Sequence, residues 1–78
     1  MIYVYILESV SGGHHYVGIT RDLKDRFARH NAGQVPHTAK YMPWVLLSYT
    51  AFADEVKAHA FERYLKSGSG RAFAKKHF

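Results

Sequence analysis

The sequence has no cysteine, and its apolar runs are short. Without cysteine, disulfide bonds and thiolate metal sites are excluded, so side-chain packing must hold the fold together. The longest apolar run, residues 1–7, is far below the roughly 20 residues that a membrane span needs. That run also lacks the basic lead-in and the small-residue cleavage site of a signal peptide. A chain of 78 residues, 47% of them hydrophobic, therefore predicts one small cytoplasmic domain over residues 1–78.

Acidic residues are scarce as well. Six Asp and Glu stand against eleven Lys and Arg, which gives a net charge of +5. Charge alone is compatible with a soluble protein that has no polyanionic partner, but its distribution favours one. Basic residues without any acid occupy the C-terminal stretch: Lys66, Arg71, Lys75 and Lys76. Nucleic acid is thus the expected partner, ahead of a membrane surface.

Two kinds of metal or acid–base site are also missing. No closely spaced pair of carboxylates is present, which disfavours a two-metal nuclease and a glycosidase. The six histidines include no ligand pair with supporting acids, so the sequence does not predict a histidine-rich zinc site.

The first third of the chain predicts a β-hairpin. Residues 2–8 and 14–20 are rich in β-branched and aromatic residues, and residues 11–13 (Ser-Gly-Gly) are a turn signal between them. Alternation places aliphatic residues on one face: Val4, Ile6, Val17 and Ile19. The opposite face then carries Tyr3, Tyr5, Leu7, Tyr16, Gly18 and Thr20. If the aliphatic sets share a core, Tyr5 and Tyr16 must share the other face.

The next segment predicts a helix and a loop. Thr20 is a plausible N-cap for a helix over residues 21–32, and Gly33 is its C-terminal stop. Leu23, Phe27 and His30 follow helical spacing on that helix. Residues 33–43 contain two prolines and are expected to be a loop with one basic residue, Lys40.

The remainder predicts a strand and two helices. Residues 44–51 form a third strand, and the apolar run at residues 45–47 favours a central position in the sheet. Asp54 is a suitable N-cap for a helix that continues to about Lys66 and is ended by Gly68. The apolar stripe of that helix is Ala58, Phe61 and Leu65. A third helix is expected over residues 69–78, with Phe73 and Phe78 facing inward. The sum is a small α/β (α+β) domain in the order ββαβαα, a three-stranded sheet flanked by three helices.

Tyr5, Tyr16 and Gly18 are the first candidates for chemistry. Strand tyrosines usually serve packing, because the ring is apolar and the hydroxyl reaches water. A glycine inside a strand, however, often marks the close approach of a ligand or of another backbone. Two phenols beside such a gap could hold a water molecule or a phosphate oxygen.

Arg26, Arg29 and His30 are candidates on the predicted first helix. Arg26 can pair with Asp22 four residues earlier, or grip a phosphate through two parallel hydrogen bonds. Arg29 has a more exposed azimuth and fits contact with a nucleic-acid backbone. His30 lies on the apolar stripe, where it is either a satisfied core residue or a proton carrier with a pKa near 6.5.

Glu62 is the candidate carboxylate. It can form a surface ion pair with Lys66 or Lys57, yet among the six acids it alone borders an apolar stripe. A single carboxylate, together with substrate phosphates and waters, is a usual way to hold Mg²⁺. The positions expected to contact the substrate are Gly18, Arg29, Lys40, Lys66 and Arg71.

These residues resemble the GIY-YIG nuclease module. Residues 3–5 (Tyr-Val-Tyr) and 16–18 (Tyr-Val-Gly) are similar to its two motifs, and the second motif tyrosine, Tyr16, follows Tyr5 by eleven positions. Arg26, His30 and Glu62 then follow in the family's order. The resemblance covers essentially the whole chain and is similar to small stand-alone bacterial members described as excinuclease-C-like, including residues 64–73.

The resemblance implies a three-stranded antiparallel-type sheet with flanking helices, and hydrolysis of DNA phosphodiesters with one divalent ion, Mg²⁺ or Mn²⁺. Glu62 matches the metal-binding glutamate and Arg26 the phosphate-stabilising arginine. Tyr5 and Tyr16 match the motif tyrosines, one of which is proposed as general base or water-positioner. His30 matches a position filled by His or Tyr.

Two positions depart from the family pattern. Tyr3 stands where the first motif has Gly, which bears on substrate access at that edge. Ile19 stands where some members have Lys, so one phosphate contact is missing.

The sequence thus predicts a metal-dependent endonuclease, with branched or damaged DNA among its candidate substrates. The metal on Glu62 would polarise the phosphate while Arg26 offsets negative charge. An unperturbed tyrosine pKa of about 10 is too high for an efficient base, so the metal or Arg26 must lower it, or His30 must help. The alternatives are a non-catalytic nucleic-acid-binding module and a protein-interaction domain. The sequence leaves open DNA against RNA and which residue is the base.

Overall fold

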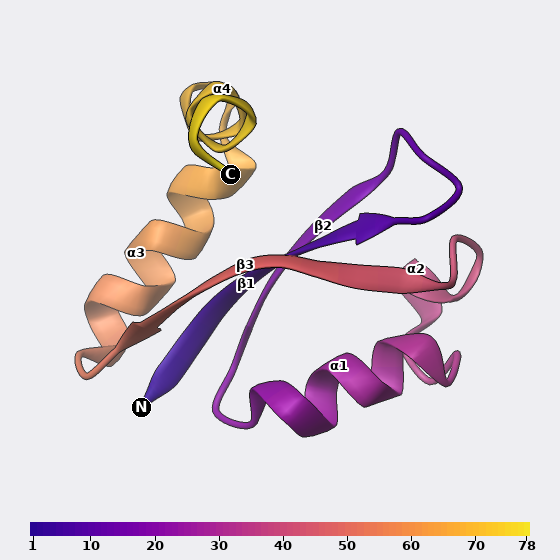
Figure 1. Cartoon of the computed structure of the whole chain (residues 1–78). Coiled ribbons are helices and arrows are strands. Elements are labelled where there is room, and N and C mark those ends of the chain that lie inside the picture. Colours follow the sequence, from indigo (N-terminus) through magenta and orange to yellow (C-terminus); the bar gives the residue numbers. More distant parts are fainter.

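The computed structural model describes residues 1–78 and has an antiparallel sheet with helices on both faces (Figure 1). The strands lie in the order β2-β1-β3, with β1 in the centre. Their bounds are β1 Ile2–Ser9, β2 His15–Thr20 and β3 Trp44–Phe52. The helices are α1 Leu23–Asn31, α2 Pro36–Ala39, α3 Glu55–Lys66 and α4 Gly68–His77. The predicted α+β class and the order ββαβαα are confirmed, with the one-turn helix α2 added.

The hairpin forms as its alternation predicted. In the β1–β2 register Tyr5 pairs with Gly18 and Ile6 pairs with Val17. Gly12 and Gly13 connect the strands with φ of 82° and 79°, a conformation that residues with a Cβ rarely adopt. This register places the two tyrosines Tyr5 and Tyr16 on the same face of the sheet.

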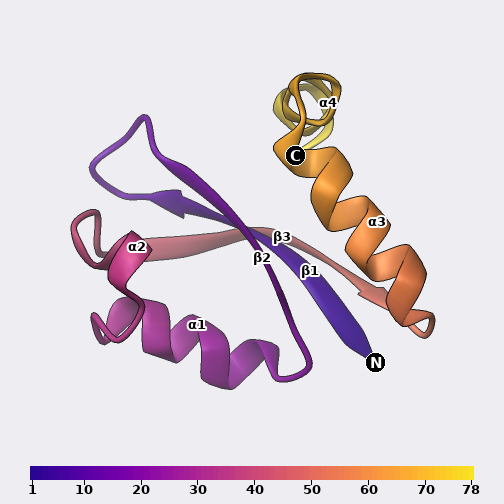
Figure 2. The ribbon, with the colours of Figure 1, turned by 180° about the vertical axis from the view of Figure 1, so that it is seen from behind.

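Each face of the sheet has its own core, and the view from behind shows α1 and α2 on one side and α3 and α4 on the other (Figure 2). The aliphatic face carries the buried cluster Ile2, Val4, Ile6, Ala58 and Leu65, with Phe61 and Phe73 packed against it. The aromatic face carries the buried cluster Tyr5, Leu7 and Trp44, with Tyr16, Leu23 and Phe27 packed against it. The predicted stripe of α3 is therefore confirmed, since Ala58 and Leu65 are buried.

The N-terminus of α1 corrects one prediction. Asp22, not Thr20, is the N-cap, and its carboxylate accepts a hydrogen bond of 3.0 Å from the amide of Asp25. Thr20 instead accepts from the amide of Asp22 at 3.1 Å, forming a turn that leads into the helix. The predicted end is correct, because Gly33 follows the C-cap with φ of 74°.

The predicted loop at residues 33–43 contains α2, which the sequence analysis missed. Pro36 occupies its first turn, where the absent amide hydrogen costs nothing. A four-residue helix leaves no periodic apolar pattern, so only the proline signalled it.

The predicted central position of β3 is wrong, because β3 is an edge strand. Its residues Val45, Leu46 and Leu47 are 44%, 36% and 38% exposed. An apolar run therefore did not indicate burial on both faces here. The pairing of β1 with β3 is also interrupted by an irregularity between Ile6 and Leu7.

The C-terminal helices correct two further expectations. Ser67 ends α3 and is also the N-cap of α4, so Gly68 begins a helix instead of ending one. Phe73 packs against the aliphatic core as predicted, but Phe78 is 40% exposed and does not face inward. None of the four helices combines the length and apolar character that crossing a bilayer requires.

Candidate active site

Tyr5 is fully buried on the aromatic face, directly across the strand pair from Gly18. A Cβ built at Gly18 would lie 2.4 Å from both Cζ and the hydroxyl oxygen of Tyr5, and 2.9 Å from the ring of Tyr16. Gly18 therefore leaves the space that the end of the Tyr5 ring occupies. The two rings are 6.2 Å apart between centroids, so the phenols are neighbours as the sequence predicted.

His30 lies beside both phenols and is itself fully buried. Its Nε2 is 2.8 Å from the Tyr5 hydroxyl, and its Nδ1 is 2.8 Å from Oγ1 of Thr38. Burial, and secondarily the charge of Arg26, lowers the pKa of His30 below its usual value. The imidazole is therefore neutral at neutral pH and has both nitrogens hydrogen-bonded.

Arg26 reaches the same cluster from the preceding turn of α1. Its pKa is raised, chiefly by the hydrogen-bonding interaction with Tyr5 and to a smaller extent by Tyr16. The suggested pairing with Asp22 does not occur, and Arg26 makes no ion pair. Arg26 as a residue is half-buried, so it interacts with the phenols without being enclosed.

Glu62 approaches from α3, which packs on the aliphatic face and against β2. Its side chain is only 16% exposed, and its carboxylate accepts a hydrogen bond of 3.0 Å from Nζ of Lys66. The ion pair weighed from the sequence thus exists, and Lys57 is not part of it. The negative charge of Glu62 is also one of the influences on the pKa of Tyr5, so it acts on the phenol cluster electrostatically.

The pKa of Tyr5 is raised above its ordinary value of 10. Burial is the main cause, and the charges of Tyr16 and Glu62 act in the same direction while Arg26 opposes them. Tyr5 therefore carries its proton at neutral pH and accepts another proton only if its own is passed on. The hydrogen bond to His30 offers that path.

The residues present fit one type of metal site. No group of three or more His, Cys, Asp or Glu side chains could enclose an ion, so a cage built from protein alone is not formed. Glu62 supplies one shielded carboxylate, which matches a Mg²⁺ site completed by phosphate oxygens and waters.

A groove of about 890 Å³ lies next to this cluster, between the hairpin and α4. Its wall includes Tyr16 and three basic residues, Lys66, Arg71 and Lys75. It also includes one acid, Glu8, which lies 3.2 Å from the ring of His15. The structure therefore places Lys66 and Arg71 in one groove wall together with Tyr16, and adds Lys75.

Three predicted substrate contacts are not part of the groove. Gly18 does not line it, and the end of the Tyr5 ring fills the space beside Gly18. Arg29 forms an exposed ion pair with Asp25, at 2.7 Å. Lys40 is exposed at the C-cap of α2 and does not line the groove.

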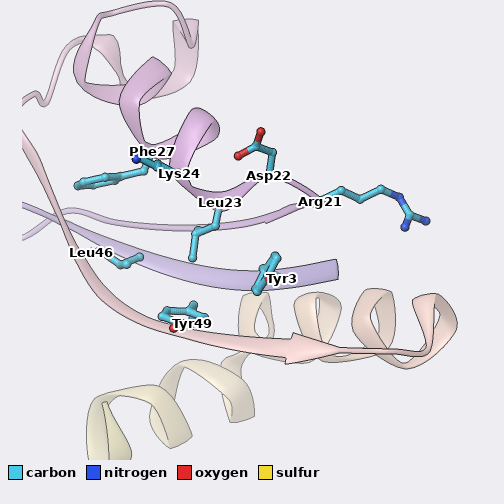
Figure 3. Close-up of a pocket in the computed structure, with 8 residues that line it drawn as sticks. All are labelled: Tyr3, Arg21, Asp22, Leu23, Lys24, Phe27, Leu46 and Tyr49. Atoms are coloured by element: carbon cyan, nitrogen blue, oxygen red, sulfur yellow. The ribbon is translucent and has the colours of Figure 1, made fainter. Parts of the chain in front are cut away.

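A second hollow, of about 450 Å³, lies between α1 and β3 (Figure 3). Tyr3 and Tyr49 line it from the sheet, with ring centroids 6.0 Å apart, and Leu23 and Phe27 line it from α1. It includes none of the polar cluster. Tyr3, the departure from the first motif, therefore faces a separate hollow.

Sequence reasoning missed three polar contacts that position the cluster. Thr38 is buried against His30, and the indole Nε1 of Trp44 donates to the carbonyl of Thr38 at 2.8 Å. Asn31 donates to the carbonyl of Trp44 at 2.9 Å and accepts from its amide at 2.6 Å. The only available signal was Thr38, two residues after Pro36, in a stretch that was otherwise expected to be loop.

Comparison with known proteins identifies relatives over nearly the whole chain. A family model described as the GIY-YIG catalytic domain matches residues 1–76. A UPF0213 protein of Lacticaseibacillus paracasei is 42% identical over 65 residues, which is 82% of this chain and 72% of that protein. A UPF0213 protein of Cupriavidus pinatubonensis is 36% identical over 78 residues, with 95% and 86% covered. One of Streptococcus pyogenes serotype M3 is 38% identical over 71 residues, with 90% and 76% covered. No solved structure matches the chain.

Proposed function

This chain belongs to the GIY-YIG nuclease family, and on that premise we propose that it is a divalent-metal-dependent endonuclease that hydrolyses phosphodiester bonds in DNA. One observation carries the proposal. Two phenols, a guanidinium and a neutral imidazole converge on the aromatic face, and the charge of the shielded carboxylate of Glu62 acts on them. These groups can accept a proton from an attacking water and place positive charge beside a phosphate, both of which assist in-line attack.

Glu62 is the residue that would hold the metal. A bound Mg²⁺ or Mn²⁺ supplies positive charge that polarises the scissile phosphate and stabilises the leaving oxygen. Lys66 contacts only Oε2 of the carboxylate, so Oε1 is the oxygen that would take the ion first.

Tyr5 and His30 act together as the base in this proposal. Tyr5 is fully buried in the free protein, so the proposal requires that substrate binding admits the attacking water to its hydroxyl. As that water gives a proton to the oxygen of Tyr5, the hydroxyl proton of Tyr5 passes to Nε2 of His30, which is 2.8 Å away. The water becomes the attacking hydroxide and His30 becomes the imidazolium, so protons and charge balance. The lowered pKa of His30 leaves the imidazole unprotonated and ready at neutral pH.

Arg26 and Tyr16 complete the site. The guanidinium of Arg26 offsets the negative charge that develops on the phosphate, and its half-buried position lets it contact both Tyr5 and the substrate. Tyr16 lies beside Tyr5 and also lines the basic groove. In that position it orients the water or the phosphate.

The basic groove is the proposed path for the nucleic-acid strand beyond the scissile phosphate. Lys66, Arg71 and Lys75 line it together with apolar residues. Phosphate contacts from such residues give affinity that depends on salt but carries no sequence information. Gly18 contributes to the site by leaving room for the end of the Tyr5 ring.

A nicking assay tests the proposal. Supercoiled plasmid and a branched DNA duplex are incubated with the protein and Mg²⁺ or Mn²⁺, with chelator alone as a blank. We expect ion-dependent nicking, and a loss of at least about 100-fold for Glu62→Gln, since a bound metal contributes several kcal/mol to the transition state. Glu55→Gln is the matched control, because Glu55 is an exposed carboxylate on the same helix, paired with Arg21. Equal nicking by the wild type and Glu62→Gln would rule the proposal out. A duplex of the same sequence made of RNA shows whether the protein distinguishes ribose from deoxyribose.

A non-catalytic nucleic-acid-binding module is the second candidate. The ion pair between Glu62 and Lys66 favours it, because the site's carboxylate already has a partner. A binder predicts no nicking with any ion. Its affinity in filter binding should be equal or higher in Glu62→Gln, since a negative charge is removed. If the protein is an endonuclease, Glu62→Gln should instead still bind DNA but should not cut it.

A further inference from the structure

A buried line of hydrogen bonds continues past the candidate active site into the interior. It runs from the Tyr5 hydroxyl to Nε2 of His30, then from Nδ1 of His30 to Oγ1 of Thr38 at 2.8 Å. From there it reaches the carbonyl oxygen of Val35, which is 3.3 Å from Oγ1 of Thr38. Tyr5, His30 and Thr38 are all at most 1% exposed, so water does not complete their hydrogen bonds.

Which atom donates in each of these hydrogen bonds follows from Tyr5, the residue at the start of the line. Tyr5 is fully buried, and its only hydrogen-bond acceptor in the structure is Nε2 of His30, since Arg26 can only donate. Tyr5 must therefore donate, and Nε2 carries no proton. A neutral imidazole then has its proton on Nδ1, which donates to Oγ1 of Thr38. The single hydroxyl hydrogen of Thr38 is left for the carbonyl of Val35, and no buried polar side-chain atom lacks a partner.

The backbone of α2 holds Thr38 in place independently of its hydroxyl. The amide of Thr38 donates to the carbonyl of Val35 at 3.1 Å, and its carbonyl accepts from the indole of Trp44 at 2.8 Å. Asn31, the residue after His30, bonds to both backbone groups of Trp44. Trp44 is thus hydrogen-bonded to both α1 and α2, and these bonds fix the distance between His30 and Thr38.

We propose that Thr38 is a positioning residue that keeps His30 in the Nδ1-protonated tautomer, the form that can take the proton of Tyr5. This inference rests on the proposed function. Thr38 accepts from Nδ1 when His30 is neutral and also after His30 becomes the imidazolium, so no hydrogen bond has to rearrange during proton transfer. The alternative tautomer would place a proton on Nε2, facing Tyr5, and would leave the Tyr5 hydroxyl without an acceptor.

The first test reads the tautomer directly and needs no catalysis. The ¹⁵N chemical shifts of the His30 ring, assigned by comparison with His30→Gln, distinguish a protonated from an unprotonated nitrogen. We expect the wild type at neutral pH to show a protonated Nδ1 and a free Nε2. A protonated Nε2 in the wild type overturns the inference, whatever any variant does.

The second test removes only the hydroxyl. Thr38→Val has nearly the same shape but no acceptor, so the ring should shift toward the Nε2-protonated tautomer, whereas Thr38→Ser should restore the wild-type spectrum. Thr50→Val is the matched control, because Thr50 is a half-buried threonine that makes no side-chain hydrogen bond. A tautomer in Thr38→Val identical to that of the wild type refutes the role of Thr38.

Nicking rates then separate this inference from the proposed function. We expect kcat to fall at least about 10-fold in Thr38→Val, with KM unchanged and with recovery in Thr38→Ser, since proton transfer contributes about 100-fold or more. If the wild type does not nick DNA, the proposed function fails while the tautomer result still stands. If the wild type nicks DNA and Thr38→Val has an unchanged rate, the inference fails and the proposed function stands.

Discussion

The two faces of the sheet are built on different principles. The aliphatic face buries Ile2, Val4 and Ile6 against α3, and its stabilisation is the non-directional burial of apolar area. The aromatic face buries Tyr5 and His30, whose polar atoms each need a partner in the right place. Substitutions on the aliphatic face should therefore lower the free energy of unfolding, whereas substitutions on the aromatic face should lower the rate of nicking. This difference can be tested one residue at a time.

Two glycines give the largest expected effects, one on each face. A Cβ at Gly70 would lie 1.7 Å from the backbone carbonyl oxygen of Tyr64, where α3 meets α4. Backbone cannot move aside cheaply, so Gly70→Ala should lose at least about 4 kcal/mol of unfolding free energy. A Cβ at Gly18 meets a side chain instead of backbone, the end of the buried Tyr5 ring. Gly18→Ala should therefore lose less stability but nearly all nicking. Urea unfolding and nicking per folded molecule measure the two quantities.

Gly68→Ala is the control for this pair, because nothing lies within 4 Å of a Cβ built there and α4 gains a better helix former. Its unfolding midpoint should equal or exceed that of the wild type. If Gly70→Ala unfolds at the same urea concentration as Gly68→Ala, the close junction between the helices is wrong. If Gly18→Ala keeps full nicking, the Tyr5 ring does not need the space above Gly18.

A pair of buried side chains gives the next largest effect. Ile2→Ala, on the aliphatic face and outside the groove, should lose about 3 kcal/mol of unfolding free energy, because Ile2 is only 6% exposed and leaves a cavity. Its nicking per folded molecule should be unchanged. Tyr5→Phe keeps the ring and loses one hydrogen bond, worth about 1 kcal/mol, but should abolish nicking. Equal losses of activity in the two variants would contradict the division between the faces.

The same division explains what could be predicted from the sequence. Alternation along the hairpin placed Tyr5 and Tyr16 on one face, because a period of two is a local property that the register preserves. Glu62 was singled out from its place beside an apolar stripe, and its side chain is indeed only 16% exposed. Both inferences needed only neighbouring residues and regular geometry.

The missed features depend on tertiary placement. The apolar run of β3 is the same whether the strand is central or, as here, at an edge, because sequence pattern does not report which strands pair. Thr38 sits outside any periodic segment, and its role arises only when α2 brings its hydroxyl to His30. Directional contacts between separate elements leave no periodic signal, and the aromatic face consists largely of such contacts.

The smallest expected effect is on the pH dependence of stability, and it comes from His30 on the aromatic face. Burial, and next the charge of Arg26, lowers the pKa of His30 in the folded state, whereas in the unfolded chain it is about 6.5. Below that pH the unfolded state binds more protons, so stability is complete above about pH 6.5 and is lost as pH falls through the lowered folded pKa. His30→Gln should therefore have a flatter dependence of the urea midpoint on pH between 7.5 and 5 than the wild type. His37→Gln, which alters an exposed histidine on α2, should keep the wild-type slope. If both variants lose the same slope, buried His30 is not what links protonation to stability, and the aromatic face does not differ from the surface in this respect.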